Sequence, residues 1–202
     1  MWLYVLQGVG LGFSAAVLPG PFLAYLISQT LERGWRRALP AAFAPLVSDG
    51  PIITLCLLVL SQVPGWFERF LHFAGGSFIL YLAFGAYKAW RNFDSNLPST
   101  NPGAQGSVFK AALMNALSPG PYIYWSLVTG PILLRGWRET PVNGIGFLAG
   151  FYATIVLSLT AIILVFSLAR ELGPKFNRAM LGVSAIALLI FGIRQLWLGI
   201  LG

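Results

Sequence analysis

Asp49 is the only carboxylate that lies well inside an apolar stretch of the sequence, in Ser48-Asp49-Gly50-Pro51. It follows Ala38 by about 11 residues, or about 17 Å of helix, which places it near the middle of a bilayer. A charge at that depth costs several kcal/mol, so we expect it to face a bundle interior or a wet cavity. It could serve as counter-charge for a substrate ammonium group or carry a coupled proton. The alternative is a structural acid, hydrogen-bonded to backbone freed by Pro45 and Pro51.

Two Pro-Gly-Pro triplets, Pro19-Gly20-Pro21 and Pro119-Gly120-Pro121, fall near the middle of apolar stretches. Proline lacks an amide hydrogen and glycine is a weak helix former, so both helices are predicted to break there. Backbone groups freed at that depth need protein, water or ligand, because lipid cannot satisfy them. The half-helices predicted to begin at Pro21 and Pro121 offer free amides that suit an anionic group such as an amino-acid carboxylate. A plain packing kink is the alternative.

Aromatic rings follow both triplets at matching positions. Phe22 corresponds to Tyr122, and Tyr25 to Trp125, at an offset of 100 residues. Such rings can line a cavity and attract a substrate ammonium group by cation–π contact, or they can pack in the core.

Polar side chains precede the second triplet as well. Asn115 and Ser118 are able to hydrogen-bond either a substrate or loose carbonyl groups. The predicted substrate-binding residues are therefore Pro19, Gly20, Pro21, Phe22, Tyr25, Asp49, Asn115, Ser118, Pro119, Gly120, Pro121, Tyr122 and Trp125. Asp49 is also the predicted proton carrier.

Other chemistry-bearing residues are sparse. The apolar stretches contain no nucleophile beside a base, no paired carboxylates and no His, Cys or acid cluster with metal-ligand spacing. We therefore expect no enzyme activity, no metal site and no cofactor. Cys56, the single cysteine, cannot form an internal disulfide and is interpreted as a small buried hydrophobe.

The composition requires that these residues sit in membrane helices. Hydrophobic residues make up 57% and charged residues 9% of the 202 residues, and the mean hydropathy is +0.75. A soluble domain has roughly a quarter charged residues. Six apolar spans are predicted, at 2–31, 38–62, 67–90, 108–134, 142–168 and 179–201. The net charge of +7 forms no contiguous basic patch, which argues against nucleic acid as a partner.

The distribution of positive charge predicts the orientation. Nine positive residues lie in or beside the loops that follow spans 1, 3 and 5, and four lie on the opposite side. The nine are Arg33, Arg36, Arg37, Lys88, Arg91, Lys110, Arg170, Lys175 and Arg178; the four are Arg69, Arg135, Arg138 and Arg194. The positive-inside rule then puts both termini outside. Arg194 is either a partner of Asp49 or a side chain that reaches the interface.

An internal repeat divides the chain. The two Pro-Gly-Pro triplets are 100 residues apart, and Gly34-Trp35-Arg36 precedes Gly136-Trp137-Arg138 by 102. The polar segment 92–107 is predicted to be a cytoplasmic linker between three-helix repeats at 1–91 and 108–202. Because three crossings is an odd number, the second repeat enters from the opposite face. The predicted fold is thus an all-α polytopic membrane protein with two inverted three-helix repeats, an arrangement associated with transporters.

Taken together, these residues resemble the LysE/RhtB amino-acid exporters of the LysE superfamily. The resemblance is carried by the first Pro-Gly-Pro, the turn Gly34-Trp35-Arg36-Arg37-Ala38, Asp49 before Gly50, and the segment 74–84 (AGGSFILYLAF), and it covers essentially the whole chain. It implies a secondary exporter that moves amino acids out of a bacterial cytoplasm, driven by a proton or ion gradient. The fourth helix of that family usually reads Asn-Pro-Lys, whereas this chain has Asn115 followed by Ser118-Pro119 and no lysine.

The leading functional hypothesis is export of a small amino acid or related zwitterion across the inner membrane. Its expected partners are the amino-acid substrate and the lipid bilayer. A second copy of the chain, in a homodimer, is a further candidate partner. One alternative is a metal-ion exporter of the same superfamily. The other is a non-transporting membrane assembly protein, in which the triplets are mere kinks.

Overall fold

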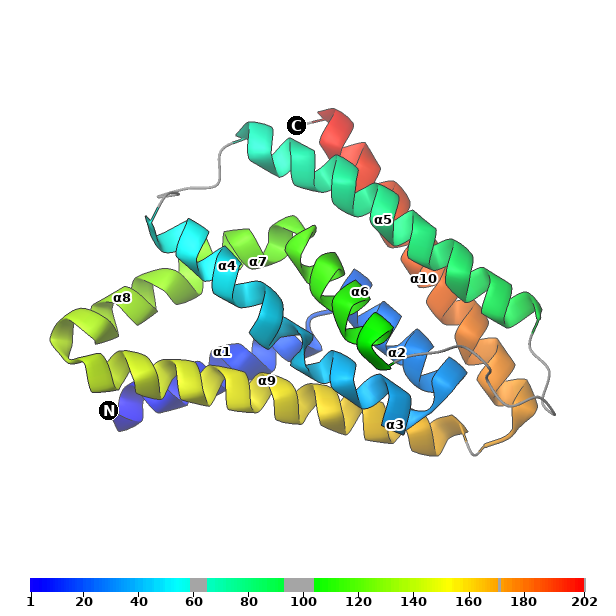
Figure 1. Cartoon of the computed structure of the whole chain (residues 1–202), viewed down its shortest axis with the longest axis horizontal. Helices are drawn as coiled ribbons and strands as arrows, with labels where there is room; N and C mark the ends of the chain where they lie inside the picture. The colour runs from blue at the N-terminus through cyan, green and yellow to red at the C-terminus, as the bar shows by residue number, and fades with distance from the viewer. Residues whose placement is uncertain (59–64, 93–103, 171, 202) are drawn as a thin grey trace.

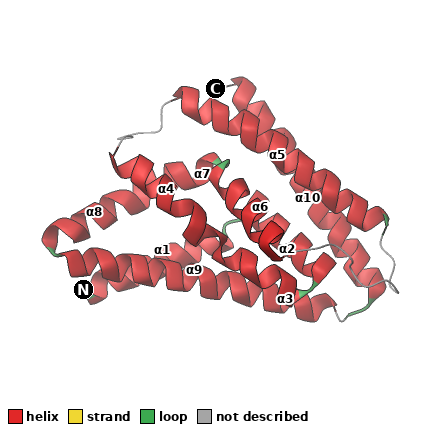
Figure 2. Ribbon diagram, viewed as in Figure 1, coloured by secondary structure: helices red, strands yellow, loops and turns green. Residues whose placement is uncertain are grey.

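The computed structural model describes residues 1–58, 65–92, 104–170 and 172–201, and every regular element in these ranges is a helix (Figure 2). The elements are α1 (Trp2–Val17), α2 (Pro21–Arg33), α3 (Trp35–Ala38), the 3₁₀ helix η1 (Leu39–Phe43), α4 (Ala44–Leu58), α5 (Gly65–Arg91), α6 (Ala104–Ala116), α7 (Pro119–Tyr124), the π-helix η2 (Trp125–Thr129), α8 (Gly130–Glu139), α9 (Pro141–Arg170) and α10 (Pro174–Leu201). Most of the predicted linker, from 93 to 103, lies outside the described residues.

Several helices are long and apolar enough to cross a membrane. Within the described ranges these are Trp35–Leu57, Arg69–Arg91, Pro141–Ala169 and Pro174–Leu201, and α1 with α2 makes a fifth if the bent pair counts as one span. The all-helical, multi-pass prediction is confirmed, but these ranges hold four or five candidate spans where six were expected. The predicted fourth span, 108–134, is divided among α6, α7, η2 and α8.

The first Pro-Gly-Pro lies between two helices that bend by 68°. Leu18 has an extended backbone, as expected for a residue that precedes proline. Gly20 is also extended, and α2 begins at Pro21. Proline is tolerated at this first helical position because its missing amide hydrogen would have no partner there.

The second triplet behaves differently. The chain is interrupted at Leu117 and Ser118, where Ser118 is extended, and α7 begins at Pro119. The prediction that the half-helix begins at Pro121 is therefore wrong by two residues. Both prolines fit within the first turn of α7, where a missing amide hydrogen costs little, so the interruption precedes the triplet.

Two long helix pairs frame the molecule: α1 packs along α9, and α5 packs along α10 (Figure 1). The first pair is held together at glycines, since a Cβ on Gly12 would meet the Phe151 carbonyl and one on Gly150 would lie 2.6 Å from the Val5 carbonyl oxygen. Such close approach of two backbones is typical of small residues in membrane helices. It fixes the position of α9 relative to α1.

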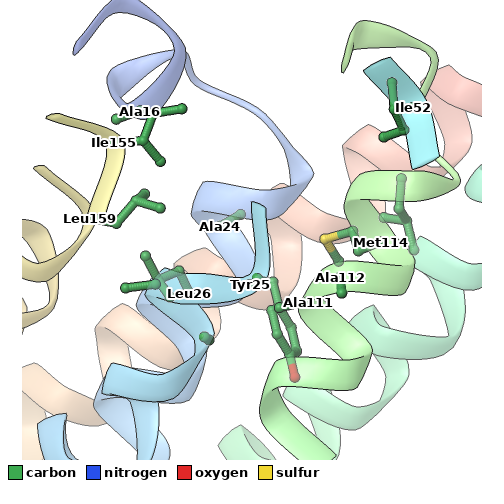
Figure 3. Packing of buried hydrophobic residues seen from close by; sticks show 14 of the residues in the cluster. Ala16, Ala24, Tyr25, Leu26, Ile52, Ala111, Ala112, Met114, Ile155 and Leu159 are labelled. Carbon is green, nitrogen blue, oxygen red and sulfur yellow. The ribbon is translucent and has the colours of Figure 1, made fainter. Parts of the chain in front are cut away.

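Shorter helices fill the space between these pairs. α4 packs against α6, and α2 packs against α6, α9 and α10. Figure 3 shows part of the resulting core, with buried side chains from α2, α4, α6 and α9 close together. α4 and α6 bring Asp49 and Asn115 to the centre of the molecule.

Gly12→Ala is expected to destabilise the protein by about 1–3 kcal/mol, because the added methyl group meets backbone that cannot rotate away. Gly10 is the matched control, because a Cβ there meets nothing within 4 Å. Thermal unfolding in detergent should show a lower melting temperature for Gly12→Ala and no decrease for Gly10→Ala. Equal melting temperatures would contradict the close α1–α9 contact.

Candidate functional site

Asp49 lies in α4 and is 4% exposed. The helix around it is irregular: the 3₁₀ helix η1 precedes α4, and Pro51 stands inside it. A carboxylate buried among apolar side chains is costly unless hydrogen-bond donors surround it. The described partners of Asp49 are side chains, three of which come from other segments of the chain.

Asn115 is the first of these partners. Its amide nitrogen Nδ2 donates to Asp49 Oδ1 at 2.8 Å and to Ser48 Oγ at 2.8 Å. Since an amide group has two N–H bonds, each contact uses one. The Ser48 hydroxyl in turn donates to the Ala44 carbonyl at 3.1 Å. The end of α6 is thereby tied to α4 through a chain of satisfied polar groups.

Tyr152 is the next partner, and Trp125 lies nearby. The Tyr152 hydroxyl donates to Asp49 Oδ2 at 3.3 Å. The Trp125 side chain is close enough to the Asp49 carboxylate to interact with it electrostatically, and its indole nitrogen, which is a donor only, suits such an acceptor. Asp49 thus joins α4 to α6, η2 and α9 at one point.

Trp125 opens the π-helix η2 and is 1% exposed. Its ring meets Phe151 edge-on, with centroids 5.2 Å apart. The Thr129 hydroxyl donates to the Tyr124 carbonyl at 3.1 Å, which satisfies a group in the widened turn. Single π-turns are often found at functional sites. Here the widened turn carries the tryptophan that faces Asp49.

Tyr122 holds the second interruption together. Its hydroxyl donates to the Ala116 carbonyl, the last residue of α6, at 2.9 Å, and its ring packs edge-on against Phe67 at 5.2 Å. The Ser118 hydroxyl donates to the Met114 carbonyl at 2.8 Å. Both side chains therefore satisfy carbonyl groups left free by the interruption, which was one of the two predicted uses for Ser118.

The remaining predicted residues are dispersed. Tyr25 is buried in α2 with its ring toward α6 (Figure 3), and Phe22 is half-buried on the same helix. Pro19 and Gly120 are exposed, Gly20 and the prolines at 21 and 121 are half-buried, and Pro119 is buried. Asp49 and Asn115 are the members of the predicted set that the described hydrogen bonds bring together, and Trp125 lies near them.

Two further predictions concern charge and metal. Arg194 is exposed on α10, and no ion pair among the described residues joins it to Asp49. In the same ranges, no three His, Cys, Asp or Glu side chains form a group able to hold a metal ion.

A comparison with protein families now adds to this geometry. The family model described as LysE type translocator matches residues 13–199, which is nearly the whole chain. The chain belongs to the LysE type translocator family. This confirms the resemblance noted in the sequence, and it identifies the protein as a multi-pass membrane transporter. Searches of curated proteins and of solved structures found no match.

Two polar residues of this candidate site are not predicted by the sequence alone. Ser48 is a neighbour of Asp49 with no pattern of its own, and Tyr152 lies in an apolar span. The signal for Tyr152 was its position two residues after Gly150, a glycine that marks a close helix contact. Which face of α9 would meet α4 depends on the packing of α1 against α9, and periodicity does not give that.

Asn115→Leu is expected to destabilise the protein by about 2–3 kcal/mol, because it removes a short hydrogen bond to a buried charge. The control is Thr54→Val on α4, the helix that carries Asp49. It removes the exposed hydrogen bond from the Thr54 hydroxyl to the Gly50 carbonyl. Unfolding in detergent measures both.

The loss should depend on the charge of Asp49. In an Asp49→Asn background, Asn115→Leu should cost clearly less, since the two residues are in direct contact and their effects are not additive. A cost that is the same in both backgrounds would show that Asn115 stabilises the fold independently of Asp49.

Proposed function

We propose that this LysE-family transporter is a secondary active exporter that carries a small amino acid or related zwitterion out of the cytoplasm, driven by a proton or ion gradient. The observation that carries the proposal is Asp49, a carboxylate 4% exposed inside an apolar span and held by hydrogen-bond donors from α6 and α9. Intramembrane acids with such partners mark ion and substrate pathways.

The donor arrangement gives Asp49 a way to couple a proton to movement. Asn115 and Tyr152 both donate to the carboxylate. When a proton binds, one carboxylate oxygen gains an O–H group and becomes a poorer acceptor, so the donor contact at that oxygen weakens or reverses. The Tyr152 contact, at 3.3 Å, is longer than the Asn115 contact at 2.8 Å and is the one we expect to change. Its loss removes a hydrogen bond that joins α4 to α9.

The substrate carboxylate is assigned to the N-terminus of α2. This helix begins at Pro21 with no side-chain cap, so its first-turn amides are free of side-chain partners. Such amides, together with the positive end of the helix dipole, favour an anionic group. Asp49 then serves the ammonium group of the same substrate, as counter-charge.

Helix pairing supports the two inverted repeats at 1–91 and 108–202. α1, which precedes the first interruption, packs on α9 of the second half, and α6, which precedes the second interruption, packs on α4 of the first half. This exchange of partners is expected when two similar halves cross the membrane in opposite directions. With both termini outside, the turn after α2 faces the cytoplasm of an inner-membrane protein.

Counterflow in proteoliposomes tests the proposal. Labelled threonine, leucine and lysine are offered to the wild type and to Asp49→Asn, with Mn²⁺ as a control cargo. We expect one amino acid to accumulate with the wild type and the rate to fall at least about tenfold with Asp49→Asn, because the amide can neither bind a proton nor balance an ammonium charge. Matching melting temperatures establish that both proteins are folded.

Other outcomes select the alternatives. Accumulation of Mn²⁺ without any amino acid would establish a metal exporter. No exchange of any cargo by folded, inserted protein would favour an assembly role. Full activity of Asp49→Asn would remove Asp49 from the mechanism while leaving the transporter itself in place.

Tyr152→Phe should reduce the transport rate by about tenfold, the equivalent of about 1.4 kcal/mol for one hydrogen bond to a charged group. Tyr124→Phe is the matched control, because it also removes one hydroxyl, whose contact is the Leu11 carbonyl at 3.1 Å. Initial counterflow rates of the two variants give the comparison. Equal rates would exclude a specific role for the Tyr152 hydroxyl.

A further inference from the structure

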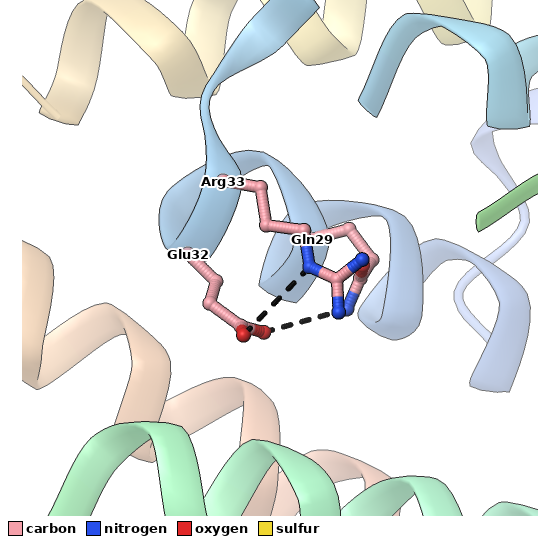
Figure 4. Close-up of polar contacts among 3 residues, drawn as sticks. All are labelled: Gln29, Glu32 and Arg33. Carbon is pink, nitrogen blue, oxygen red and sulfur yellow. Dashed lines mark hydrogen bonds and ion pairs between the residues drawn. The ribbon is translucent and has the colours of Figure 1, made fainter. Parts of the chain in front are cut away.

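A second polar cluster lies at the C-terminal end of α2, away from Asp49. Gln29 Nε2 donates to Glu32 Oε2 at 3.5 Å, and Arg33 Nε lies 3.8 Å from Glu32 Oε1 (Figure 4). The Glu32 and Arg33 side chains are 21% and 17% exposed, so both charges are largely withdrawn from solvent. Charge-assisted hydrogen bonds are normally about 2.8 Å long. Both contacts are therefore too long to satisfy the groups that make them.

Two buried polar atoms of this cluster have no hydrogen-bond partner among the described residues. Gln29 is 7% exposed, and its carbonyl oxygen Oε1 has no hydrogen-bond partner among the described residues. Arg33 Nε, also buried, has no hydrogen-bond partner in those ranges either. A buried acceptor and a buried donor left without a hydrogen bond each cost about 1–3 kcal/mol. Groups of this kind in a folded protein are able to bind water or a ligand that supplies the missing bonds.

Its charges select the class of ligand. A carboxylate and a guanidinium lie side by side, and Lys110 also acts electrostatically on Glu32. The two positive charges of Arg33 and Lys110 disfavour a simple cation, and a simple anion would bind Arg33 but would give Glu32 and Gln29 Oε1 no new donor. A zwitterion has one charged group of each sign, so each of them finds an oppositely charged side chain in the cluster. The guanidinium is shaped to bind a carboxylate through two parallel hydrogen bonds, and Glu32 and Gln29 Oε1 are both acceptors for an ammonium group.

We infer that Gln29, Glu32 and Arg33 form a second binding site for the zwitterionic substrate, at the cytoplasmic mouth of the transporter. Arg33 takes the substrate carboxylate, and Glu32 with Gln29 takes its ammonium group. The inference rests on the proposed export function. It adds a site that loads the substrate before it reaches Asp49 and that selects molecules with both charges.

The position of the cluster agrees with this order of events. α2 runs from Pro21 at the interruption to Arg33, and its 13 residues extend about 20 Å at about 1.5 Å per residue. The turn that follows it, at Gly34, begins the group of arginines predicted to face the cytoplasm. An exported substrate therefore passes the C-terminal end of α2 first and the N-terminal end later.

Transport kinetics from each membrane face test the site. In inside-out vesicles, Glu32→Gln and Arg33→Gln should raise the half-saturating substrate concentration about tenfold, while the maximal rate stays within about twofold. In right-side-out vesicles the same variants should leave the half-saturating concentration unchanged. The substrate is whichever of threonine, leucine or lysine exchanges with the wild type.

Competition by altered substrates separates a binding role from a structural one. For leucine the competitors are leucinamide, which lacks the carboxylate, and 4-methylpentanoate, which lacks the ammonium group; threonine and lysine have corresponding pairs. From the cytoplasmic face, the preference of Arg33→Gln for leucine over leucinamide should be about tenfold smaller than that of the wild type, and its preference for leucine over 4-methylpentanoate should be unchanged. For Glu32→Gln, the preference over 4-methylpentanoate should be about tenfold smaller and the preference over leucinamide unchanged. Arg33→Lys, which keeps the charge, should recover part of the loss.

The matched control is Arg135→Gln, which breaks the exposed pair between Arg135 and Glu139 at 3.7 Å. It should change none of these values. Unchanged cytoplasmic half-saturation in Glu32→Gln and Arg33→Gln, or equal changes from both faces, would overturn the separate site while wild-type exchange upholds the exporter. Failure of the wild type to exchange any amino acid overturns both.

Discussion

A buried carboxylate must be surrounded by donors, and in this transporter that requirement decides where several helices lie. Asp49 accepts hydrogen bonds from Asn115 in the last turn of α6 and from Tyr152 in α9, and Trp125 at the start of η2 lies near it. The segments α6 and α9 must each approach α4 within hydrogen-bond distance. The glycine contacts between α1 and α9 then matter to the site as well, because they set the position of the helix that carries Tyr152. The packing of α1 against α9 therefore also determines the surroundings of Asp49.

The interruptions supply what continuous helices could not. A straight helix through 104–139 would run past α4 with one fixed face, whereas the step at Leu117 and Ser118 lets Asn115 and Trp125 both reach Asp49. The carbonyls freed by this step are taken up by the Tyr122 and Ser118 hydroxyls. Among the described residues, neither α2 nor α7 has a side-chain cap at its start. The carbonyls that end α6 are thus taken up by the protein's own hydroxyl groups, while the first-turn amides after each interruption have no side-chain partner in the described ranges.

Sequence reasoning reached the parts of this arrangement that composition and local chemistry control. The apolar helices and the family followed from residue types and spacing, whereas the roles of Asp49, Asn115 and the two triplets in transport stay predictions. The start of α7 was misplaced because proline is compatible with a first helical turn, so the extended residue is Ser118 rather than one within the triplet. Tyr152 was not found because its role depends on which face of α9 meets α4. Nor could the sequence show that Gln29 is buried with an acceptor unfilled.

The two proposed sites differ in the groups that would bind the charges of a zwitterionic substrate. This difference suggests an order in which an exported substrate changes its binding partners. At the cytoplasmic mouth, Glu32 and Arg33 provide side chains of both signs. At the centre, Asp49 provides a negative side chain, and the substrate carboxylate depends on the backbone amides at Pro21. A substrate moving along α2 therefore exchanges a guanidinium for amide dipoles while its ammonium group passes from one carboxylate to another. An ionised carboxylate has about four acceptor positions, and Asn115 and Tyr152 each take one at Asp49. The ammonium group therefore binds beside these donors while Asp49 is ionised, and the arrival of a proton at Asp49 removes the negative charge that holds it.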